Sequence, residues 1–450
     1  MTDTAARAAA LDAADPLAAH TAAFVRDPSV VSYLDGNSLG RPLAALEQRF
    51  ARFIGHDWGT RLIRGWDEGW MRRPYDLGDR LGALVGAAAG QAFVGDSTTV
   101  LLYKLVRAAV DAQAASGRTE IIIEDDSFPT DRFIVEGVAA ERGLDIRWIE
   151  VDRAAGVTLE QVRAIVGERT ALVLLSHVAY RSGHVADVAG ITAAAHDAGA
   201  LVLWDLCHSA GVIPTELDES GVDLAVGCTY KYLNGGPGSP AFGYVRRELQ
   251  TALAQPIQGW MGAADVFAMA PRYEPAPDLR RFASGTPPVL ATVALEAMVE
   301  LLEQVGVDAV REKSVALTDF AEASLEAHVL PLGARLASPP AGPTRGSHLT
   351  VTHPAFREVT ERLWARGVIP DFRGPDGIRV GLSPLSTTFA EVETGVAAIG
   401  RGSRDAFAGI AGMLFGAGAY ALAYPFMKEH VLGVGDLGKV TLASSIGGPA

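Results

Sequence analysis

The sequence predicts an α/β fold in which a large domain with a mostly parallel sheet is followed by a smaller α+β C-terminal domain. Continuous apolar runs are typical of strands whose two faces are both covered by helices. Such runs occupy residues 121–123, 172–175, 201–204 and 224–226. Helical stretches such as residues 191–198 lie between them, and this alternation is the pattern of a parallel sheet with crossover helices.

The rest of the chain follows in order. Residues 1–45 form an Ala-rich N-terminal arm, helical or poorly ordered, with a short strand near residues 31–34 that enters an Asp-Gly-Asn-Ser turn. Residues 46–290 form the large domain. Residues 291–402 form the small domain, which starts with a long helical region to about residue 327. Its strands are predicted at residues 348–351 and 378–382.

Residues 403–450 form an atypical, apolar C-terminal extension rich in Gly and Ala. Residues 406–427 carry no charge, and their length would suffice for a bilayer-spanning helix. Ala and Gly favour membrane insertion only weakly, and Pro425 would interrupt a helix near its end. We therefore expect residues 403–450 to form a loosely packed appendage, and we do not expect a membrane anchor.

The composition limits the partners and the compartment. A net charge of −14 without a basic patch argues against nucleic acid. The two cysteines cannot build a disulfide framework and lack zinc-ligand spacing, so no metal site is expected. The N-terminus lacks the basic-then-apolar order of a signal peptide. These features together favour a cytoplasmic protein.

Polar side chains follow the apolar run at residues 201–204. Asp205 ends the run and His208 comes three residues later. A buried acid needs a partner. The pyridinium nitrogen of a cofactor is suitable, because the carboxylate keeps that nitrogen protonated and strengthens the ring as an electron sink. Asp205 could instead cap the next helix, or ligate a metal together with His208, although no third ligand is evident nearby.

A lysine follows the next strand. Lys231 lies between Tyr230 and Tyr232, just before a turn rich in glycine at residues 235–238. An ε-amine in this position can form a Schiff base with an aldehyde cofactor, whereas the alternative is a solvated loop lysine. Lys231 lies 26 residues after Asp205, which leaves room for one short helix and one strand. Neighbouring strands would then bring both residues to one cofactor.

Two further strand ends carry polar or aromatic groups. Phe128 and Asp131 follow the run at residues 121–123. The ring could stack on a pyridine and the acid could bond a ring substituent, but a core Phe beside a Pro turn is an equal alternative. Thr98 and Thr99 stand at the start of a predicted helix, where N–H groups suit a phosphate and where an ordinary N-cap is also expected.

Acid, strand and lysine in this order resemble the pyridoxal-phosphate enzymes of the aspartate-aminotransferase fold. Over about residues 33–388 the chain resembles the kynureninase family in particular. The lysine and histidine motifs are specific, whereas GTPP and GW are not specific by themselves. The motifs that carry the resemblance are LDGNSLG (34–40), FPTD (128–131), WDLCHSAG (204–211), YKYLNGGPGSP (230–240), GW (259–260), GTPP (285–288) and RVGLSPL (379–385).

The resemblance implies a hydrolase that uses pyridoxal 5'-phosphate to cleave the Cβ–Cγ bond of L-kynurenine or 3-hydroxykynurenine. The products would be anthranilate or 3-hydroxyanthranilate and L-alanine, in tryptophan catabolism or NAD biosynthesis. Lys231 would carry the cofactor and move protons, Asp205 would pair with the pyridine nitrogen, and Tyr230 would donate a proton. The resemblance also implies a homodimer with shared active sites, in which Trp260 and Thr286 reach the cofactor of the other subunit.

The resemblance also assigns residues to the substrate and the cofactor. Arg379 would hold the α-carboxylate, for which a planar guanidinium suits better than an ammonium, although a surface ion pair is the alternative. Trp66 would stack on the aniline ring, although tryptophans at this spacing could equally be core residues. Asn37, in the LDGNSLG motif, is the third expected substrate contact. The expected cofactor contacts are Thr98, Thr99, Phe128, Pro129, Thr130, Asp131, Ser176, Asp205, His208, Tyr230, Lys231, Trp260 and Thr286.

Two other functions stay open. A cysteine desulfurase of the same fold would need a nucleophilic cysteine on a mobile loop, whereas Cys207 and Cys228 follow strand ends. The second is an inactive, membrane-tethered relative that uses the C-terminal extension. The chain departs from the family pattern at Ser386, where tyrosine is usual, and at Leu101, where asparagine is frequent. Both departures concern details of binding.

Overall fold

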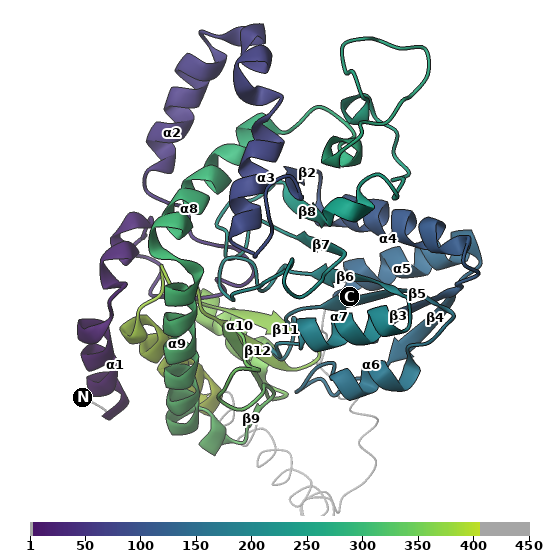
Figure 1. Ribbon diagram of the computed structural model, residues 1–450. Helices are drawn as coiled ribbons and strands as arrows, with labels where there is room; N and C mark the ends of the chain where they lie inside the picture. Colours follow the sequence, from purple (N-terminus) through teal and green to yellow (C-terminus); the bar gives the residue numbers. More distant parts are fainter. Residues whose placement is uncertain (1–2, 406–450) are drawn as a thin grey trace, which may run out of the picture.

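Two β-sheets organise the protein, whose computed structural model describes residues 3–405 (Figure 1). The larger sheet has seven strands in the order β2-β8-β7-β6-β5-β3-β4. These are β2 (Ala92–Gly95), β3 (Glu120–Glu124), β4 (Asp145–Ile149), β5 (Thr170–Ser176), β6 (Leu201–Asp205), β7 (Leu224–Gly227) and β8 (Ala241–Val245). Neighbours from β7 to β4 are parallel, and β8 runs antiparallel to β2 and β7. The predicted α/β fold with a mostly parallel sheet is confirmed.

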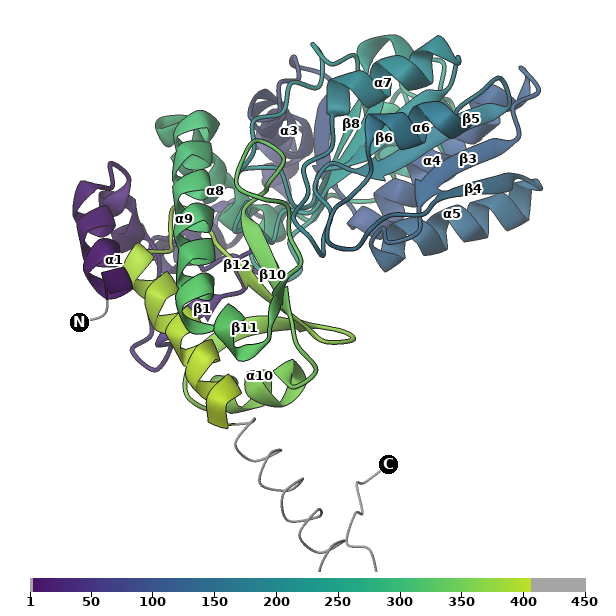
Figure 2. The ribbon, with the colours of Figure 1, turned by 90° about the horizontal axis from the view of Figure 1, so that it is seen from below.

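Alternate residues of the central strands point to opposite faces of this sheet. On one face Leu172 and Leu203 belong to a core shared with α4 (Thr98–Ala114) and α5 (Pro129–Arg142). On the other face Val173 and Val202 belong to a core shared with α6 (Leu159–Ile165) and α7 (Val188–Asp197). Figure 2 shows these two helical layers on either side of the strands. Because both faces are buried, the strand sequences are continuously apolar instead of alternating.

The connection between β6 and β7 differs from the prediction. A short helix was expected there, but the residues between Asp205 and β7 form turns. Gly211 has a left-handed backbone (φ 85°), and Pro214 follows soon after, so the chain cannot continue in a helical conformation. Strands β2, β4 and β8 were not predicted.

The smaller sheet has five strands in the order β1-β11-β12-β10-β9. They are β1 (Ser32–Leu34), β9 (Arg335–Leu336), β10 (His348–Thr352), β11 (Val368–Arg373) and β12 (Gly377–Gly381). Strand β1 comes from the N-terminal arm and pairs in parallel with β11, whereas the other neighbours are antiparallel. The start of the chain therefore contributes to the sheet that also carries Arg379.

Helices surround the smaller sheet and connect it to the larger one. The predicted long helical region consists of two helices, α8 (Thr292–Val305) and α9 (Val307–His328), separated by Gly306 with a φ of 84°. Helix α1 (Asp3–Ala14) lies beside α9, and α10 (Phe356–Trp364) packs on β11 (Figure 1). Helices α2 (Leu46–Arg52) and α3 (Arg73–Ala83) pack against α8.

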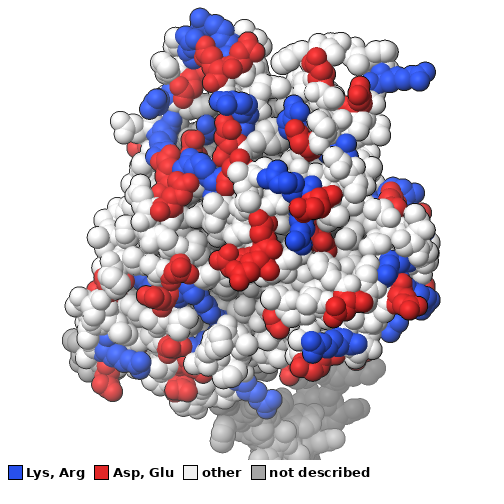
Figure 3. Space-filling view, viewed as in Figure 1, with Lys and Arg blue, Asp and Glu red and all other residues white. Residues whose placement is uncertain are grey.

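Most of the predicted C-terminal extension lies outside the described residues, which end at 405. Residues 389–405 are helical, so the described part of the extension continues a helix that begins in the small domain. Within residues 3–405, no helix is both long and apolar enough to cross a membrane. Figure 3 shows acidic and basic side chains interspersed over one face of the molecule.

Candidate functional site

The carboxyl ends of five strands of the larger sheet meet around a cavity of about 140 Å³. Parallel strands place their carboxyl ends at one edge of the sheet, and ligands of open α/β sheets bind at this edge. The cavity brings together ten of the residues predicted from the sequence. They are Thr98, Thr99, Phe128, Thr130, Asp131, Ser176, Asp205, His208, Tyr230 and Lys231.

Lys231 is buried in this cavity without a carboxylate partner. Its side chain is 8% exposed, and its Nζ lies 3.3 Å from Nε2 of His208. Two other buried lysines, Lys104 and Lys313, each form an ion pair with an aspartate. Lys231 forms an ion pair with none of the carboxylates between residues 3 and 405. Because burying an unpaired ammonium is costly, the cavity favours chemistry at this amine over a structural role.

Flat rings surround the amine. The Lys231 Nζ lies 5.7 Å from the centre of the Phe128 ring and 5.9 Å from that of Tyr230. The Phe128 ring meets Tyr180 edge to face, with ring centres 5.5 Å apart. Burial, together with the charges of Lys231 and an arginine of the small domain, lowers the pKa of His208 well below its ordinary value. His208 is therefore a neutral ring, which can pack on a flat aromatic ligand without charge repulsion.

Carboxyl groups gather at another part of the cavity wall. Asp205 accepts a hydrogen bond from the Cys207 N–H at 2.7 Å, and Asp131 accepts one from the Ser127 hydroxyl at 3.1 Å. The Oδ1 atom of Asp131 is buried and has no hydrogen-bond partner among the described residues. Burial and the neighbouring Asp205 raise the pKa of Asp131 well above its ordinary value. Two facing carboxyl groups of this kind suit a ligand that brings an N–H group or a positive charge.

A third carboxyl group lies close by. Glu124 is the last residue of β3 and is 4% exposed. Burial raises its pKa to about 8, and the charges of Asp126, Asp125 and Asp205 act in the same direction. Glu124 therefore holds a proton at neutral pH and adds no negative charge beside Asp205.

The first turn of α4 provides a site for an anion. Ser97 caps this helix, and its Oγ accepts a hydrogen bond from the Val100 N–H at 3.4 Å. Thr98 and Thr99 follow, and N–H groups in the first turn of a helix have no partner within the helix. Free N–H groups, two hydroxyls and the helix dipole together favour a phosphate.

Arg379, on β12, is held by three segments of the chain. Its Nε donates to Asp371 at 2.7 Å, its Nη1 to the carbonyl of Tyr180 at 2.6 Å, and its Nη2 to Ser38 Oγ at 2.8 Å. Because Tyr180 lines the Lys231 cavity, this contact connects the guanidinium to the cavity wall. Asp371 also pairs with Arg373 at 2.7 Å. The guanidinium is 1% exposed and fixed in orientation, and it is not the surface ion pair considered as an alternative.

Two buried polar side chains lie near Arg379. Both atoms of the Asn37 amide lack a partner among the described residues, whereas the His348 ring interacts with the backbone of Arg181 and Tyr180, and both residues are 0% exposed. A Cβ on Gly381 would lie 1.8 Å from Asn37 Oδ1, so only glycine at this position admits the amide. The His348 ring centre lies 5.7 Å from that of His208. Buried polar groups without partners are rare, and they indicate that a ligand or water completes this region.

Besides Arg379 and Asn37, four predicted residues do not line the cavity within one chain. Pro129 is the first residue of α5, directly behind Phe128. Trp66 packs perpendicular to Trp70, with ring centres 5.4 Å apart, in a cluster beside α8. Trp260 is 44% exposed in a short helical turn, and Thr286 lines a separate hollow beside β2.

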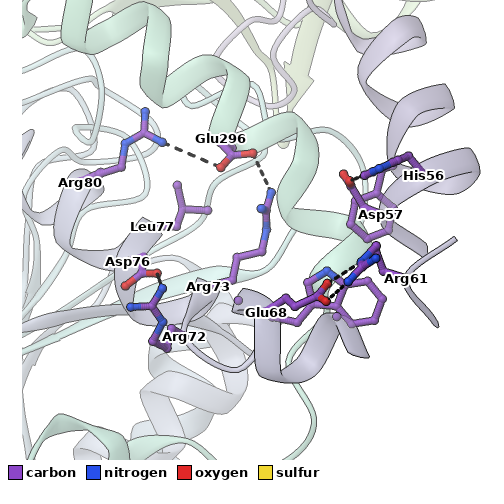
Figure 4. A pocket seen from close by; sticks show the side chains of 14 residues that line it. His56, Asp57, Arg61, Glu68, Arg72, Arg73, Asp76, Leu77, Arg80 and Glu296 are labelled. Carbon is purple, nitrogen blue, oxygen red and sulfur yellow. Dashed lines mark hydrogen bonds and ion pairs between the residues drawn. The ribbon is translucent and has the colours of Figure 1, made fainter. Parts of the chain in front are cut away.

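A larger hollow of about 460 Å³ lies between residues 53–72, α3 and α8, and its charged side chains are shown in Figure 4. Arg73 reaches Glu296 at 2.8 Å, and His56 contacts Asp57 at 2.8 Å. Arg61 pairs with Glu68 in the same wall. Because these basic groups face acidic groups, the hollow has no unpaired group comparable to Lys231.

Several residues of the site were not predicted from the sequence. Ser97 and Cys207 line the cavity directly beside predicted residues. The available signals were the position of Ser97 just before Thr98 and the WDLCHSAG motif, which contains Cys207. Tyr180 lies on an irregular loop after β5, and nothing in its sequence context indicates its position. Ser38 and Asp371 contact Arg379 from opposite ends of the chain, and only the fold brings them together.

Known proteins are similar to this chain over most of its length. The Aminotransferase class-V family matches residues 84–355. Kynureninase from Pseudomonas fluorescens is 41% identical over 397 residues, which cover 87% of this chain and 93% of that protein. Kynureninase from Burkholderia pseudomallei (strain 1106a) is 42% identical over 388 residues, covering 86% and 92%. The chain belongs to the kynureninase family.

Solved structures are also similar in fold to this member of the kynureninase family. The cysteine desulfurase from Thermococcus onnurineus NA1 superposes with a TM-score of 0.73 at 17% identity, covering 85% of this chain and all (100%) of that chain. The cysteine desulfurase CsdA from Escherichia coli gives 0.71 at 18% identity, covering 86% and 98%. At these identities the likeness concerns the fold alone. Cys207 and Cys228 are both buried, which does not fit the exposed nucleophile of a desulfurase.

Proposed function

We propose that this protein is a pyridoxal-phosphate-dependent hydrolase that cleaves L-kynurenine at its Cβ–Cγ bond into anthranilate and L-alanine. The observation that carries the proposal is the buried, unpaired amine of Lys231 in one cavity with Asp205. The identity of 41% to a kynureninase over 87% of the chain supports the choice of substrate. The 3-hydroxy derivative of kynurenine is the second candidate substrate, because one ring hydroxyl is distinguished by only one or two contacts.

The cavity fits pyridoxal 5'-phosphate at three places. The amine of Lys231 has no carboxylate partner among the described residues, so it is free to bond an aldehyde. The unpaired Oδ1 of Asp131 and the carboxyl group of Asp205 suit a protonated ring nitrogen and a ring substituent. The first turn of α4, with Thr98 and Thr99, suits the phosphate. His208 and Phe128 would cover the faces of the ring.

When bound, the cofactor would supply an electron sink that stabilises negative charge on the substrate carbons. Arg379 would bind the α-carboxylate with an orientation that its three hydrogen bonds already fix. Lys231 would take the α-proton, and Asp205 would keep the ring nitrogen protonated. Tyr230 would donate a proton to the β-carbon as anthranilate leaves, and burial raises the pKa of its hydroxyl, which keeps it protonated as a donor needs. A water molecule adds to the γ-carbonyl and supplies the oxygen of the new carboxylate.

Asn37 and His348 would complete the substrate side of the cavity. Both are buried, and the amide of Asn37 lacks a partner among the described residues, so a bound α-carboxylate or an ordered water would satisfy it. His348 also has a pKa well below its ordinary value, because it is buried and lies near Arg379 and Lys231. A neutral imidazole here would donate one hydrogen bond without competing with Arg379 for the negative charge.

The proposed active form is a cytoplasmic homodimer with shared active sites, acting in tryptophan catabolism or NAD biosynthesis. Trp260 is 44% exposed and does not line the Lys231 cavity of its own chain, so it is available to a second copy. Ile54, Leu62 and Phe267 are further exposed apolar side chains, at 52%, 56% and 61%. The proposed compartment is supported by Cys207 and Cys228, which are free thiols.

The first experiment measures turnover. Purified protein with pyridoxal phosphate and L-kynurenine is expected to release anthranilate, which is detected by its fluorescence. Lys231→Ala is expected to abolish turnover and the visible absorption of the bound cofactor. Lys231→Arg keeps the charge but lacks a primary amine that can bond the aldehyde, so it should be equally inactive. Persistence of turnover in either variant would disprove the proposal.

A second experiment tests the shared site. Lys231→Ala and Trp260→Ala proteins are mixed under conditions that exchange subunits. If Trp260 serves the other subunit, each hybrid dimer contains one site with both residues intact, and activity returns above that of either parent. If Trp260 serves its own subunit, both sites of the hybrid stay defective, and the mixture is no more active than the sum of its parts.

A further inference from the structure

The two cysteines of the chain meet directly beside the Lys231 cavity. Strands β6 and β7 are adjacent and parallel, with Asp205 paired to Val226, so Cys207 and Cys228 each lie two residues beyond this pair. The Cys228 N–H donates to Cys207 Sγ at 3.2 Å, and the Cys228 thiol donates to the Cys207 carbonyl at 3.7 Å. Both cysteines lie just beyond the ends of these strands, and the two hydrogen bonds hold Cys228 directly against Cys207, as a disulfide between them requires.

The position of the pair determines how a reagent would reach it. Cys207 and Cys228 are 8% and 3% exposed, so the outer surface offers little access. Cys207 nevertheless lines the Lys231 cavity, and its N–H is bonded to Asp205. A small molecule that enters the cavity of the cofactor-free protein would therefore reach Cys207 and, directly behind it, Cys228, and a ligand that fills the cavity would cover them.

The two thiols differ in acidity. The hydrogen bond with Cys228 and burial raise the pKa of Cys207 well above its ordinary value. Burial also opposes ionisation of Cys228, but the hydrogen bond from Cys207 and the charge of Lys231 outweigh it and lower the pKa of Cys228. A neighbouring thiolate and thiol are the two partners that disulfide formation needs, one as nucleophile and one as resolving thiol.

We propose that Cys207 and Cys228 form a dithiol modification site that a hydroperoxide oxidises to a disulfide through the open cavity. The thiolate of Cys228 attacks one oxygen of hydrogen peroxide, the O–O bond breaks, and the released hydroxide takes a proton and leaves as water. The sulfur of Cys207 then attacks the sulfenic acid on Cys228, the S–O bond breaks, and a second water carries away the thiol proton. The two sulfurs lose two electrons, and one peroxide is reduced to two waters.

The disulfide would change the cofactor site. In the reduced protein, Cys207 Sγ accepts a hydrogen bond from the N–H of Cys228, which lies two residues before Tyr230. The N–H of Cys207 donates a hydrogen bond to the Asp205 carboxylate and so orients it. A covalent bond between the sulfurs draws these two segments together. The oxidised protein is expected to bind pyridoxal phosphate at least tenfold more weakly, and a thiol reductant should restore binding. The access route, but not the disulfide, rests on the proposed function.

The test compares holoenzyme and cofactor-free protein treated with hydrogen peroxide. Both samples are then digested without reduction and analysed by mass spectrometry. The expected result is a peptide that joins Cys207 to Cys228, formed several-fold faster in the cofactor-free protein and lost on reduction. Cys228→Ser should yield no joined peptide, and the cysteine left in it should react more slowly than the pair.

Three results would overturn the proposal. Independent oxidation of the two cysteines without a joined peptide would show that the sulfurs do not react with each other. Equal rates with and without pyridoxal phosphate would exclude the cavity as the route. Unchanged cofactor affinity after complete oxidation would exclude the expected effect on the site. Peptide mapping does not depend on kynurenine turnover, so a wrong substrate assignment would leave the disulfide result intact.

Discussion

Replacing Glu124 with glutamine is expected to stabilise the protein at alkaline pH. Glu124 is buried at the end of β3, and its pKa is raised from 4.5 to about 8, first of all by burial. The folded protein therefore binds a proton that the unfolded chain releases between these two values. Stability from this group is fully present below pH 4.5 and is lost as pH rises through about 8. Glutamine resembles the protonated acid in shape and hydrogen bonding, but it does not titrate.

The size of the effect follows from the two pKa values. One bound proton changes the free energy of unfolding by about 1.4 kcal/mol per pH unit between them. From pH 5 to pH 8 the wild type should lose about 3.5 kcal/mol that Glu124→Gln keeps. For a chain of 450 residues the unfolding entropy is about 0.9 kcal/mol/K. The melting temperature of the variant should therefore equal that of the wild type at pH 5 and exceed it by about 4 °C at pH 8.

Differential scanning calorimetry of the cofactor-free proteins between pH 5 and pH 8 measures this difference directly. Other titrating groups contribute equally to both proteins, so the comparison isolates Glu124. Glu160→Gln, at an exposed position in the first turn of α6, is the matched control and should follow the wild type at every pH. A constant difference between Glu124→Gln and wild type over this range would refute the reasoning, because it would show that Glu124 is ionised in the folded protein.

Three further predictions concern substrate binding, packing and the C-terminal extension. Arg379→Lys should raise the KM for kynurenine about 10- to 100-fold with a smaller change in kcat, because it loses at least one charge-assisted hydrogen bond; an unchanged KM in steady-state kinetics would contradict this. Gly78→Ala should lower the melting temperature by about 1–3 °C, because the new Cβ would lie 2.3 Å from the carbonyl oxygen of Ala92. Gly55→Ala is the matched control and should leave the melting temperature unchanged, because nothing lies within 4 Å of its new Cβ. Truncation after Asp405 should leave turnover intact, since the cavity residues all precede it; loss of anthranilate production would show that the extension is needed.

The sequence was informative where side chains follow buried strands. Continuous apolar runs identify β5, β6 and β7. The polar residues at or just beyond the ends of these strands, Ser176, Asp205 and Lys231, meet in one cavity because parallel strands end at one edge. Their convergence could be predicted before any contact was known. The proton on Glu124 could not, because it depends on how completely the fold buries that residue.

The sequence was less informative where contacts join distant segments. The Gly-rich segment around Asn37 was recognised only as a motif, yet it reaches Gly381 on β12 in the other half of the chain. Tyr180 lies on a loop without a periodic pattern, so its contact with Arg379 has no signature in the sequence. Trp260 and Thr286 stay predictions, because their proposed roles require a second copy of the chain, and Trp66 stays one because its proposed role requires bound substrate.

The bond between Ser38 and Arg379 also has a consequence for the order of assembly during synthesis. These residues are 341 positions apart. All residues that line the Lys231 cavity lie between 97 and 231, and the sheet that carries them is complete after β8, at residue 245. A growing chain can therefore close its cofactor pocket well before Arg379, the proposed substrate-binding residue, has been translated. We expect nascent chains that end shortly after β8 to gain affinity for pyridoxal phosphate while they still cannot hold an amino acid.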